Sequence, residues 1–419
     1  MTQLIMEYIQ QFELARESSK QMHKLSAEFV NKVLTDLAEE IVKQTDEILK
    51  ANQLDLNNMD HSDPKYDRLL LNPDRVAAIA ADIRNVATLK SPLGEVLENK
   101  VMENGLDISK IRVPLGVIGV IYEARPNVTL DVFALCLKTG NVAILKGGKD
   151  ADETNRALLL IIHSVLAENK VDTGVVTLLP ADRKATEELL SARAYVDVII
   201  PRGSQGLIDF VRENSKVPVI ETGAGIVHTY FDISGDLEKG KAILFNAKTR
   251  RVSVCNSLDC LLIHRERLND LAMLVAPMAG KDVQLYADPA AFEALKAIYP
   301  EGLLHQAGPE DFGTEFLDYK LAIKTVSELD EALRHIASFS SRHSEAIIAE
   351  DDQKQTLFLN AVDAAAVYVN ASTSFTDGGQ FGMGAEIGIS TQKLHARGPM
   401  GLSELTSYKW IVRGNGQVR

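Results

Sequence analysis

Short apolar segments alternate with amphipathic helical patterns in the first half of the chain, and this alternation most restricts how the chain can fold. Segments typical of buried strands cover residues 117–123, 141–147, 175–180, 196–203 and 217–223. Apolar strands separated by helices are typical of a parallel sheet with helices on both faces. We therefore predict a doubly wound α/β domain whose ligands bind beyond the carboxyl ends of the strands.

The same alternation starts again after residue 233. The predicted strands there read "SLDCLLIH", "LAIKTV", "SEAIIAE" and "AAVYVNA", and helical patterns such as "ELDEALRHIASF" separate them. A chain of 419 residues is also long for one hydrophobic core. The sequence therefore predicts a second α/β domain.

Two segments outside the alternation predict additional β structure. Asn104 and Gly105 lie between two strand-like runs at about 99–115, which is a strong signal for a hairpin. The tail from 386 to 419 is Gly-rich and then strand-like, so it requires a partner strand. The first 50 residues or so, by contrast, carry apolar side chains at helical spacing.

The charge and the apolar pattern exclude several classes of partner. A net charge of −13 disfavours binding to nucleic acid, and the basic residues form no polybasic patch for a membrane surface. No apolar run approaches the roughly 18 residues that cross a bilayer. The start, "MTQLIMEYIQQFELARESSK", lacks the features of a signal peptide. We expect a cytoplasmic protein with no nucleic-acid or membrane partner.

The chain has three cysteines, Cys136, Cys255 and Cys260. Their spacing forms no C-x-x-C pair, so we predict no disulfide and no metal site. Cys136 and Cys260 lie in apolar segments and are expected in the core. Cys255, in "RRVSVCNS", lies where a strand-like run stops. Burial is the ordinary interpretation of a lone cysteine, but a helical turn starting here would lower the thiol pKa.

Two strand ends carry residues suited to a phosphate or a ribose. No G-x-G-x-x-G follows the first strand, and "GAGIVH" at 223–228 lacks the third glycine. Lys146 and Gly147 instead end a strand just before a helix, and Gly203 and Ser204 repeat this arrangement. A helix N-terminus can bind such groups, although a polar turn explains the same residues.

Two further polar residues follow predicted strands. Asn127 comes after Pro126, and its amide would suit an oxyanion, although asparagine is also common in turns. Glu221 ends an apolar strand, where its carboxylate could take or relay a proton or could simply be held by backbone amides.

The order of these residues resembles that of the aldehyde dehydrogenase superfamily. The resemblance extends over about residues 20–412 and includes "PLGVIGVIYEARPNVT", "VPVIETGAG", "VCNSLDCLLIH" and "GAEIGISTQKLHARGPMGL". Three positions depart from the usual pattern: Val252 replaces a proline, Ser374 an arginine, and Lys146 an arginine found in many relatives.

The resemblance implies an activity and a set of roles. It implies reduction of L-glutamyl 5-phosphate by NADPH to L-glutamate 5-semialdehyde, with release of phosphate. Cys255 would be the nucleophile, Asn127 the oxyanion donor and Glu221 a proton relay or a cofactor-placing residue. The residues implied to bind NADP are Lys146, Gly147, Gly203, Ser204 and Glu386.

The resemblance also implies a domain organisation. Residues 1–232, with about 365–385, would form the NADP-binding domain, and 233–364 the catalytic domain. The hairpin at 99–115 and the tail at 386–419 would form a β arm for a homo-oligomer, either a dimer or a tetramer. Because no kinase segment precedes this region, glutamate 5-kinase would be a separate and possible partner.

Two alternatives stay open on sequence alone. Another member of the superfamily would resolve the thioester with water or with CoA in place of phosphate. A catalytically silent scaffold could also have this fold, because a fold does not dictate a function.

Overall fold

The structure, a computed structural model, describes residues 2–61, 63, 66–123 and 125–419, and the chain divides into two compact units. Unit 1 runs to Thr222 and adds Gly382–Gly388 and Met400–Arg419, and unit 2 comprises Gly223–Phe381 and Ile389–Pro399. The sequence puts the boundary at 232 and assigns about 365–385 to the first domain. The difference arises because β7 (His228–Phe231) and β13 (Ala366–Val369) both pair with β12 (Ser344–Ile348).

Unit 1 begins with helices, as the sequence predicts, and continues with alternating strands and helices. Its helices are α1 (Thr2–Ser19), α2 (Ala27–Lys43), α3 (Thr45–Leu56), α4 (Tyr66–Leu69), α5 (Pro73–Thr88), α6 (Asn127–Lys138), α7 (Asp152–Glu168), α8 (Arg183–Ser191) and α9 (Gln205–Asn214). Its strands are β1 (Val96–Val101), β2 (Asp107–Pro114), β3 (Val117–Tyr122), β4 (Val142–Lys146), β5 (Val176–Leu178), β6 (Val198–Arg202) and β16 (Thr406–Arg413).

The main sheet of unit 1 is parallel and has the order β5-β4-β3-β6. Every residue of β3 and β4 is buried, as expected for strands covered on both faces. The strand predicted at 217–223 is wrong, because this segment contributes only an isolated bridge between Ile199 and Val219. Pro218 in this segment has no N–H to donate to a ladder.

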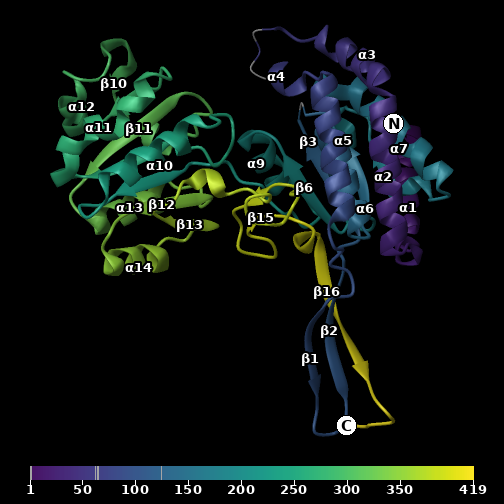
Figure 1. Ribbon diagram of the computed structural model, residues 1–419. Coiled ribbons are helices and arrows are strands. Elements are labelled where there is room, and N and C mark those ends of the chain that lie inside the picture. The colour runs from purple at the N-terminus through teal and green to yellow at the C-terminus, as the bar shows by residue number, and fades with distance from the viewer. Residues whose placement is uncertain (1, 62, 64–65, 124) are drawn as a thin grey trace. The chain divides into compact units, whose positions relative to one another are not determined.

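The predicted hairpin is confirmed and forms part of a three-stranded antiparallel sheet, which we call the arm (Figure 1). Gly105 makes the turn with a φ of 84°. The tail strand β16 pairs with β2 along its whole length, so β2 is the central strand. Every residue of β1 is exposed, as are Tyr408, Trp410 and Val412 on β16.

Unit 2 contains the second predicted α/β domain. Its main strands are β7, β8 (Cys260–His264), β9 (Gln284–Ala287), β10 (Leu304–Gln306), β11 (Lys320–Val326), β12 and β13, and its short strands are β14 (Ile389–Ser390) and β15 (Gly398–Pro399). Its helices are α10 (Leu237–Thr249), α11 (Leu268–Ala279), α12 (Pro289–Leu295), α13 (Leu329–Phe339) and α14 (Asp352–Ala361). The main sheet is parallel, with the order β10-β9-β11-β8-β7-β12-β13. The sequence did not predict β7, β9 or β10, which have only three or four residues each.

Helices cover both faces of the unit 2 sheet, so the predicted doubly wound α/β fold is confirmed. Side chains alternate along β8: Leu261 and Ile263 join the core under α10–α12, whereas Cys260 and Leu262 join the core under α13 and α14. Among the described residues, no helix has both the length and the apolar character needed to span a bilayer.

Candidate active site

Lys146 ends β4 at the carboxyl edge of the unit 1 sheet. Its side chain is largely buried, with 8% of the residue exposed, and its Nζ donates to the carbonyl of Gly147 at 3.0 Å. Burial lowers the pKa of Lys146. A largely buried ammonium at a strand end is suited to an anionic or hydroxyl-bearing ligand.

Gly147 allows the backbone to pack closely against an amide with an unused donor. A Cβ on Gly147 would lie 2.4 Å from the Asn155 Nδ2 atom. This Nδ2 is buried and has no hydrogen-bond partner among the described residues, although Asn155 Oδ1 accepts from Thr129 at 2.8 Å. A buried donor without a partner is costly, so a polar group that reached this amide would offset the cost. Asn155 has no sequence signal except its place one helical turn after the start of α7.

Gly203 and Ser204 follow β6 and precede α9, as predicted, but a carboxylate already occupies this helix start. The Ser204 N–H donates to Glu123 Oε2 at 2.8 Å and its hydroxyl donates to Glu123 Oε1 at 3.0 Å. Glu123, which directly follows β3, was not among the predicted site residues. A pyrophosphate at this position would compete with the Glu123 carboxylate for the same donors.

Glu221 and Glu386 also belong to unit 1. Glu221 Oε2 lies 3.4 Å from the guanidinium of Arg212 on α9. Glu386 is half-buried in the returning segment Gly382–Gly388. A Cβ on Gly388 would lie 2.3 Å from an Arg202 nitrogen, so this segment packs directly against the end of β6.

Asn127 is the first residue of α6, and its amide is oriented by the same helix. Its Nδ2 donates to Asp131 Oδ2 at 2.8 Å, which uses one of the two N–H groups of the amide. Burial raises the pKa of Asp131 to about 7, partly opposed by the hydrogen bond from Asn127. Asp131 has no counterpart in the sequence prediction. Its separation of four residues is one helical turn and could have identified it.

Cys255 lies in unit 2, in a turn between α10 and β8, so the predicted residues are divided between the two units. The thiol-bearing residue is half-buried, whereas Cys136 and Cys260 are buried, as predicted. The helical turn considered at Cys255 is absent, because the chain passes through turns and enters β8 directly. The thiol therefore gains no helix N-terminus from its own segment.

The residue after the thiol fixes the turn. Asn256 is buried, and its amide donates to the carbonyls of Thr376 at 2.9 Å and Ser374 at 3.4 Å. The Thr373 hydroxyl returns a hydrogen bond to the Asn256 carbonyl at 2.9 Å. The Ser374 position therefore holds the Cys255 turn through its backbone. Sequence reasoning did not identify Asn256, although it is adjacent to Cys255.

A buried ion pair fixes the other end of the same turn. Lys248 Nζ donates to the Leu258 carbonyl at 2.9 Å and lies 3.9 Å from Asp259 Oδ1. Asp259 also accepts from the Phe316 N–H at 3.1 Å. Burial lowers the pKa of Lys248 and raises the pKa of Asp259, and the attraction between the two charges opposes both shifts. Lys248 is thus a structural residue, unlike the exposed Arg250 and Arg251.

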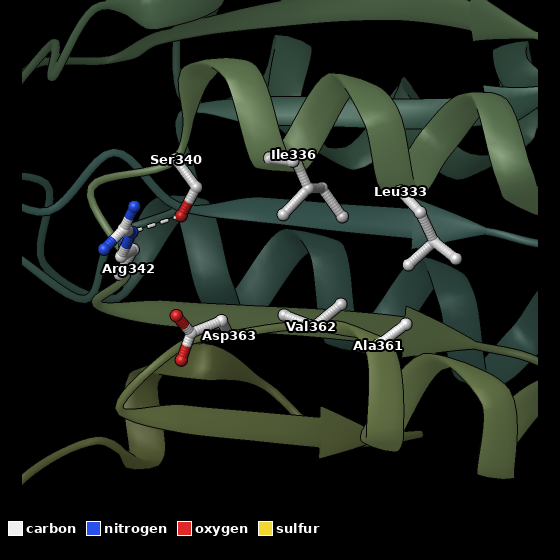
Figure 2. A pocket seen from close by; sticks show the side chains of 8 residues that line it. Leu333, Ile336, Ser340, Arg342, Ala361, Val362 and Asp363 are labelled. Atoms are coloured by element: carbon white, nitrogen blue, oxygen red, sulfur yellow. Dashed lines mark hydrogen bonds between the residues drawn. The ribbon is translucent and has the colours of Figure 1, made fainter. Parts of the chain in front are cut away.

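A separate small cavity of about 120 Å3 lies between α13 and the end of α14 (Figure 2). Leu333, Ile336 and Val362 form its apolar side, and Arg342 and Asp363 lie toward one end. Pockets that bind drug-sized ligands have volumes of roughly 300–1,000 Å3, so this cavity is too small for one. None of the predicted site residues lines this cavity, so it does not serve the predicted reaction.

Comparisons with known proteins agree with the predicted fold. A model of the aldehyde dehydrogenase family matches residues 6–281. The chain is 61% identical to a gamma-glutamyl phosphate reductase of Chlorobium chlorochromatii, over 96% of each chain. It is 59% identical to that of Bacteroides fragilis, over 97% of this chain and 98% of the relative.

Solved structures give the same result. The crystal structure of a gamma-glutamyl phosphate reductase from Thermotoga maritima is 41% identical, with a TM-score of 0.93, and the match covers 99% of this chain and all of that one. An acetylating aldehyde dehydrogenase from Geobacillus thermoglucosidasius is 18% identical, with a TM-score of 0.72, over 100% of this chain and 98% of that one. The latter likeness is one of fold alone.

Proposed function

Because the chain belongs to the aldehyde dehydrogenase family, as one of its gamma-glutamyl phosphate reductases, we propose that it converts L-glutamyl 5-phosphate to L-glutamate 5-semialdehyde with NADPH. It is thus an oxidoreductase of proline biosynthesis, and members of its family use a nicotinamide dinucleotide. The observation that carries the proposal is a half-buried thiol, Cys255, on a turn fixed by the Asn256 amide. We propose that the reaction takes place in the cytoplasm.

In this proposal the thiolate of Cys255 attacks the acyl carbonyl carbon. Phosphate leaves with the electrons of the broken C–O bond, and a thioester remains on Cys255. Asn127 and the Cys255 N–H stabilise the oxyanion that forms on the carbonyl oxygen. Breaking the C–S bond of the reduced adduct then releases the semialdehyde and restores the thiolate.

The cofactor supplies a hydride when it is bound. Lys146 would hold the adenosine ribose or its 2′-phosphate, and the unused donor of the buried Asn155 amide beside Gly147 supports this position. Gly203 and Ser204 would approach the pyrophosphate or the nicotinamide, and Glu386 the nicotinamide ribose. Glu221 would relay a proton or position the cofactor, since phosphate release requires no water-activating base.

The proposed partners follow from the same function. We propose a homo-oligomer, dimer or tetramer, in which the arm meets a second copy, because β1 is an exposed edge strand. Glutamyl phosphate cyclises readily in water, so glutamate 5-kinase would have to deliver it rapidly, and association with that kinase remains a proposal.

The deciding experiment runs the reaction in reverse, because the forward substrate is unstable. Glutamate semialdehyde and NADP+ are mixed with purified protein, and NADPH absorbance is followed with and without inorganic phosphate. NADPH formation that depends on phosphate is expected. Cys255→Ala should abolish it while NADPH still binds, and Cys260→Ala should keep most activity.

Other outcomes would identify the alternatives. NADPH formed without phosphate would mean that water resolves the thioester and that Glu221 is the base of a hydrolytic enzyme. Formation that requires CoA would indicate a CoA-acylating enzyme. A fully active Cys255→Ala protein would contradict the proposed thioester, and no activity with any acceptor would favour a silent scaffold.

A further inference from the structure

Three potential metal ligands meet beside the main sheet of unit 2. His228 lies on β7, Cys260 on β8 and His335 on α13. His228 and Cys260 are direct neighbours in the parallel register of the two strands. One ligand atom from each of the three side chains lies within 4.8 Å of the other two. The proposed reaction gives none of them a role.

The imidazole of His228 has one satisfied nitrogen and one unsatisfied nitrogen. The side chain is fully buried, and its Nδ1 lies 3.2 Å from the Glu345 carboxylate, which is also fully buried. Its Nε2 is buried and has no hydrogen-bond partner among the described residues. A carboxylate on one ring nitrogen is the usual means of orienting a histidine whose other nitrogen binds a metal.

The other two side chains lie close to each other and to His228. Cys260 Sγ lies 3.9 Å from His335 Nε2, and the rings of His228 and His335 meet edge to face at 5.5 Å. A cysteine binds a metal ion as the thiolate, so metal binding at Cys260 would displace the thiol proton.

We propose that His228, Cys260 and His335 form a binding site for a thiophilic d10 metal ion, with Zn2+ as the first candidate. One thiolate and two imidazoles are ligands that both Zn2+ and Cu+ accept. The Cys260 thiolate and the Glu345 carboxylate together offset a charge of +2. Zinc bonds of about 2.0–2.3 Å require ligand atoms roughly 3.3–3.7 Å apart, so the three side chains must close by about 1 Å.

The sequence does not predict this site, because its ligands come from three separate elements and form no C-x-x-C or H-x-x-x-H pattern. Only the pairing of β7 with β8, and α13 above them, brings the ligands together. Two half-buried aromatic rings, Phe312 and Phe339, both contact His335.

The test uses a Cys255→Ala background, because the half-buried thiol of Cys255 could otherwise bind the added metal ion. The full chain is treated with a chelator, dialysed and titrated with Zn2+ and separately with Co2+. One equivalent of Zn2+ should be retained, and Co2+ should give a thiolate-to-cobalt charge-transfer band. X-ray absorption should show one sulfur at about 2.3 Å and nitrogen at about 2.0 Å.

Three further variants in this background decide the assignment. Cys260→Ser and His335→Phe should each lower the zinc affinity at least tenfold, and His335→Phe keeps a ring among Phe312 and Phe339. Cys136→Ser, a buried cysteine of unit 1, should bind zinc unchanged. Circular dichroism and thermal melts confirm folding, and Zn2+ should raise the Tm only where it binds.

Two results would overturn the site: no uptake of Zn2+ or of Cu+ under reducing conditions, or uptake that Cys260→Ser and His335→Phe leave unchanged. Uptake of Cu+ alone, lost in both variants, would support the site and assign the ion.

Discussion

A Cβ on Gly225 would lie 1.5 Å from the carbonyl oxygen of Cys255. The backbone of Gly225 is therefore in direct contact with the backbone of the residue that carries the proposed nucleophile. Both residues belong to unit 2. Gly225→Ala must therefore displace the Cys255 turn. Displacing reacting atoms by about 1 Å can lower the rate about 100-fold, and we expect kcat to fall by about this factor. Steady-state kinetics of the reverse reaction measure it.

Gly302→Ala is the matched control for this prediction. Gly302 is also in unit 2, and a Cβ there would have no neighbour within 4 Å. Its kcat should stay within twofold of the original. Equal losses in the two variants would mean that the contact between Gly225 and Cys255 does not position the thiol.

Asn256→Ala should destabilise the protein and weaken the hold on the Cys255 turn. The change leaves the carbonyl of Thr376 without its 2.9 Å donor in a buried setting, and such a loss costs about 1–3 kcal/mol. Urea unfolding measures it. Asn214→Ala is the control, because Asn214 also donates to a main-chain carbonyl but is exposed. If both variants lose the same free energy of unfolding, the buried hydrogen bonds of Asn256 do not stabilise the protein more than an exposed one does.

Lys146→Ala should weaken binding of NADPH with little change in kcat. A charge-assisted hydrogen bond is worth about 1.5–3 kcal/mol, so we expect KM for NADPH to rise tenfold or more. The neighbouring Lys149 is exposed, and Lys149→Ala should leave KM near its original value. If the ammonium contacts the 2′-phosphate, KM for NADH should change much less than KM for NADPH. A change in kcat alone would contradict a cofactor-binding role.

The exposed apolar side chains of the arm predict self-association. Trp410 is 53% exposed on β16, and a charge there should separate the proposed oligomer. Light scattering should report a dimer or tetramer for the original protein and a smaller species for Trp410→Glu. Leu160→Glu, at an exposed leucine of α7, is the control. A monomer at micromolar concentration in the original protein would refute the prediction.

Acid should destabilise the protein through His343. Burial lowers the pKa of His343 from 6.5 to about 4. Between these values the unfolded chain binds a proton that the native state does not, so stability falls as the pH falls through this window. His343→Gln should reduce the loss in unfolding free energy between pH 7 and pH 5. His23→Gln, at an exposed histidine, should leave that loss unchanged.

Elements with a strong local pattern were the predictable part of the fold. The strands β3, β4 and β8 are continuous apolar runs, and Gly105 marks the hairpin turn by its positive φ. The short strands β7, β9 and β10 have too few residues to show a period. The segment 217–223 looked like a strand because of its apolar composition, but it forms only one bridge.

The candidate site shows a similar division. Lys146 was predicted from its place at a strand end just before a helix, and Cys255 from its place in the characteristic segment "VCNSLDCLLIH". The contact of Glu123 with Ser204, just before α9, joins two residues that are 81 positions apart in the sequence. The hydrogen bonds of the Asn256 amide join residues about 120 positions apart. Such contacts leave no mark in local spacing, so only the folded chain reveals them.

Because β2 pairs with β16, the sheet of the arm cannot be completed until the end of the chain has been synthesised. The ribosome makes β2 roughly 300 residues before β16, which at about 5–20 residues per second is a delay of some 15–60 s. During that time one edge of β2 has no strand from its own chain to cover it. Neighbouring nascent chains on one messenger RNA would present the same open edge, so partner selection could begin before either chain is complete.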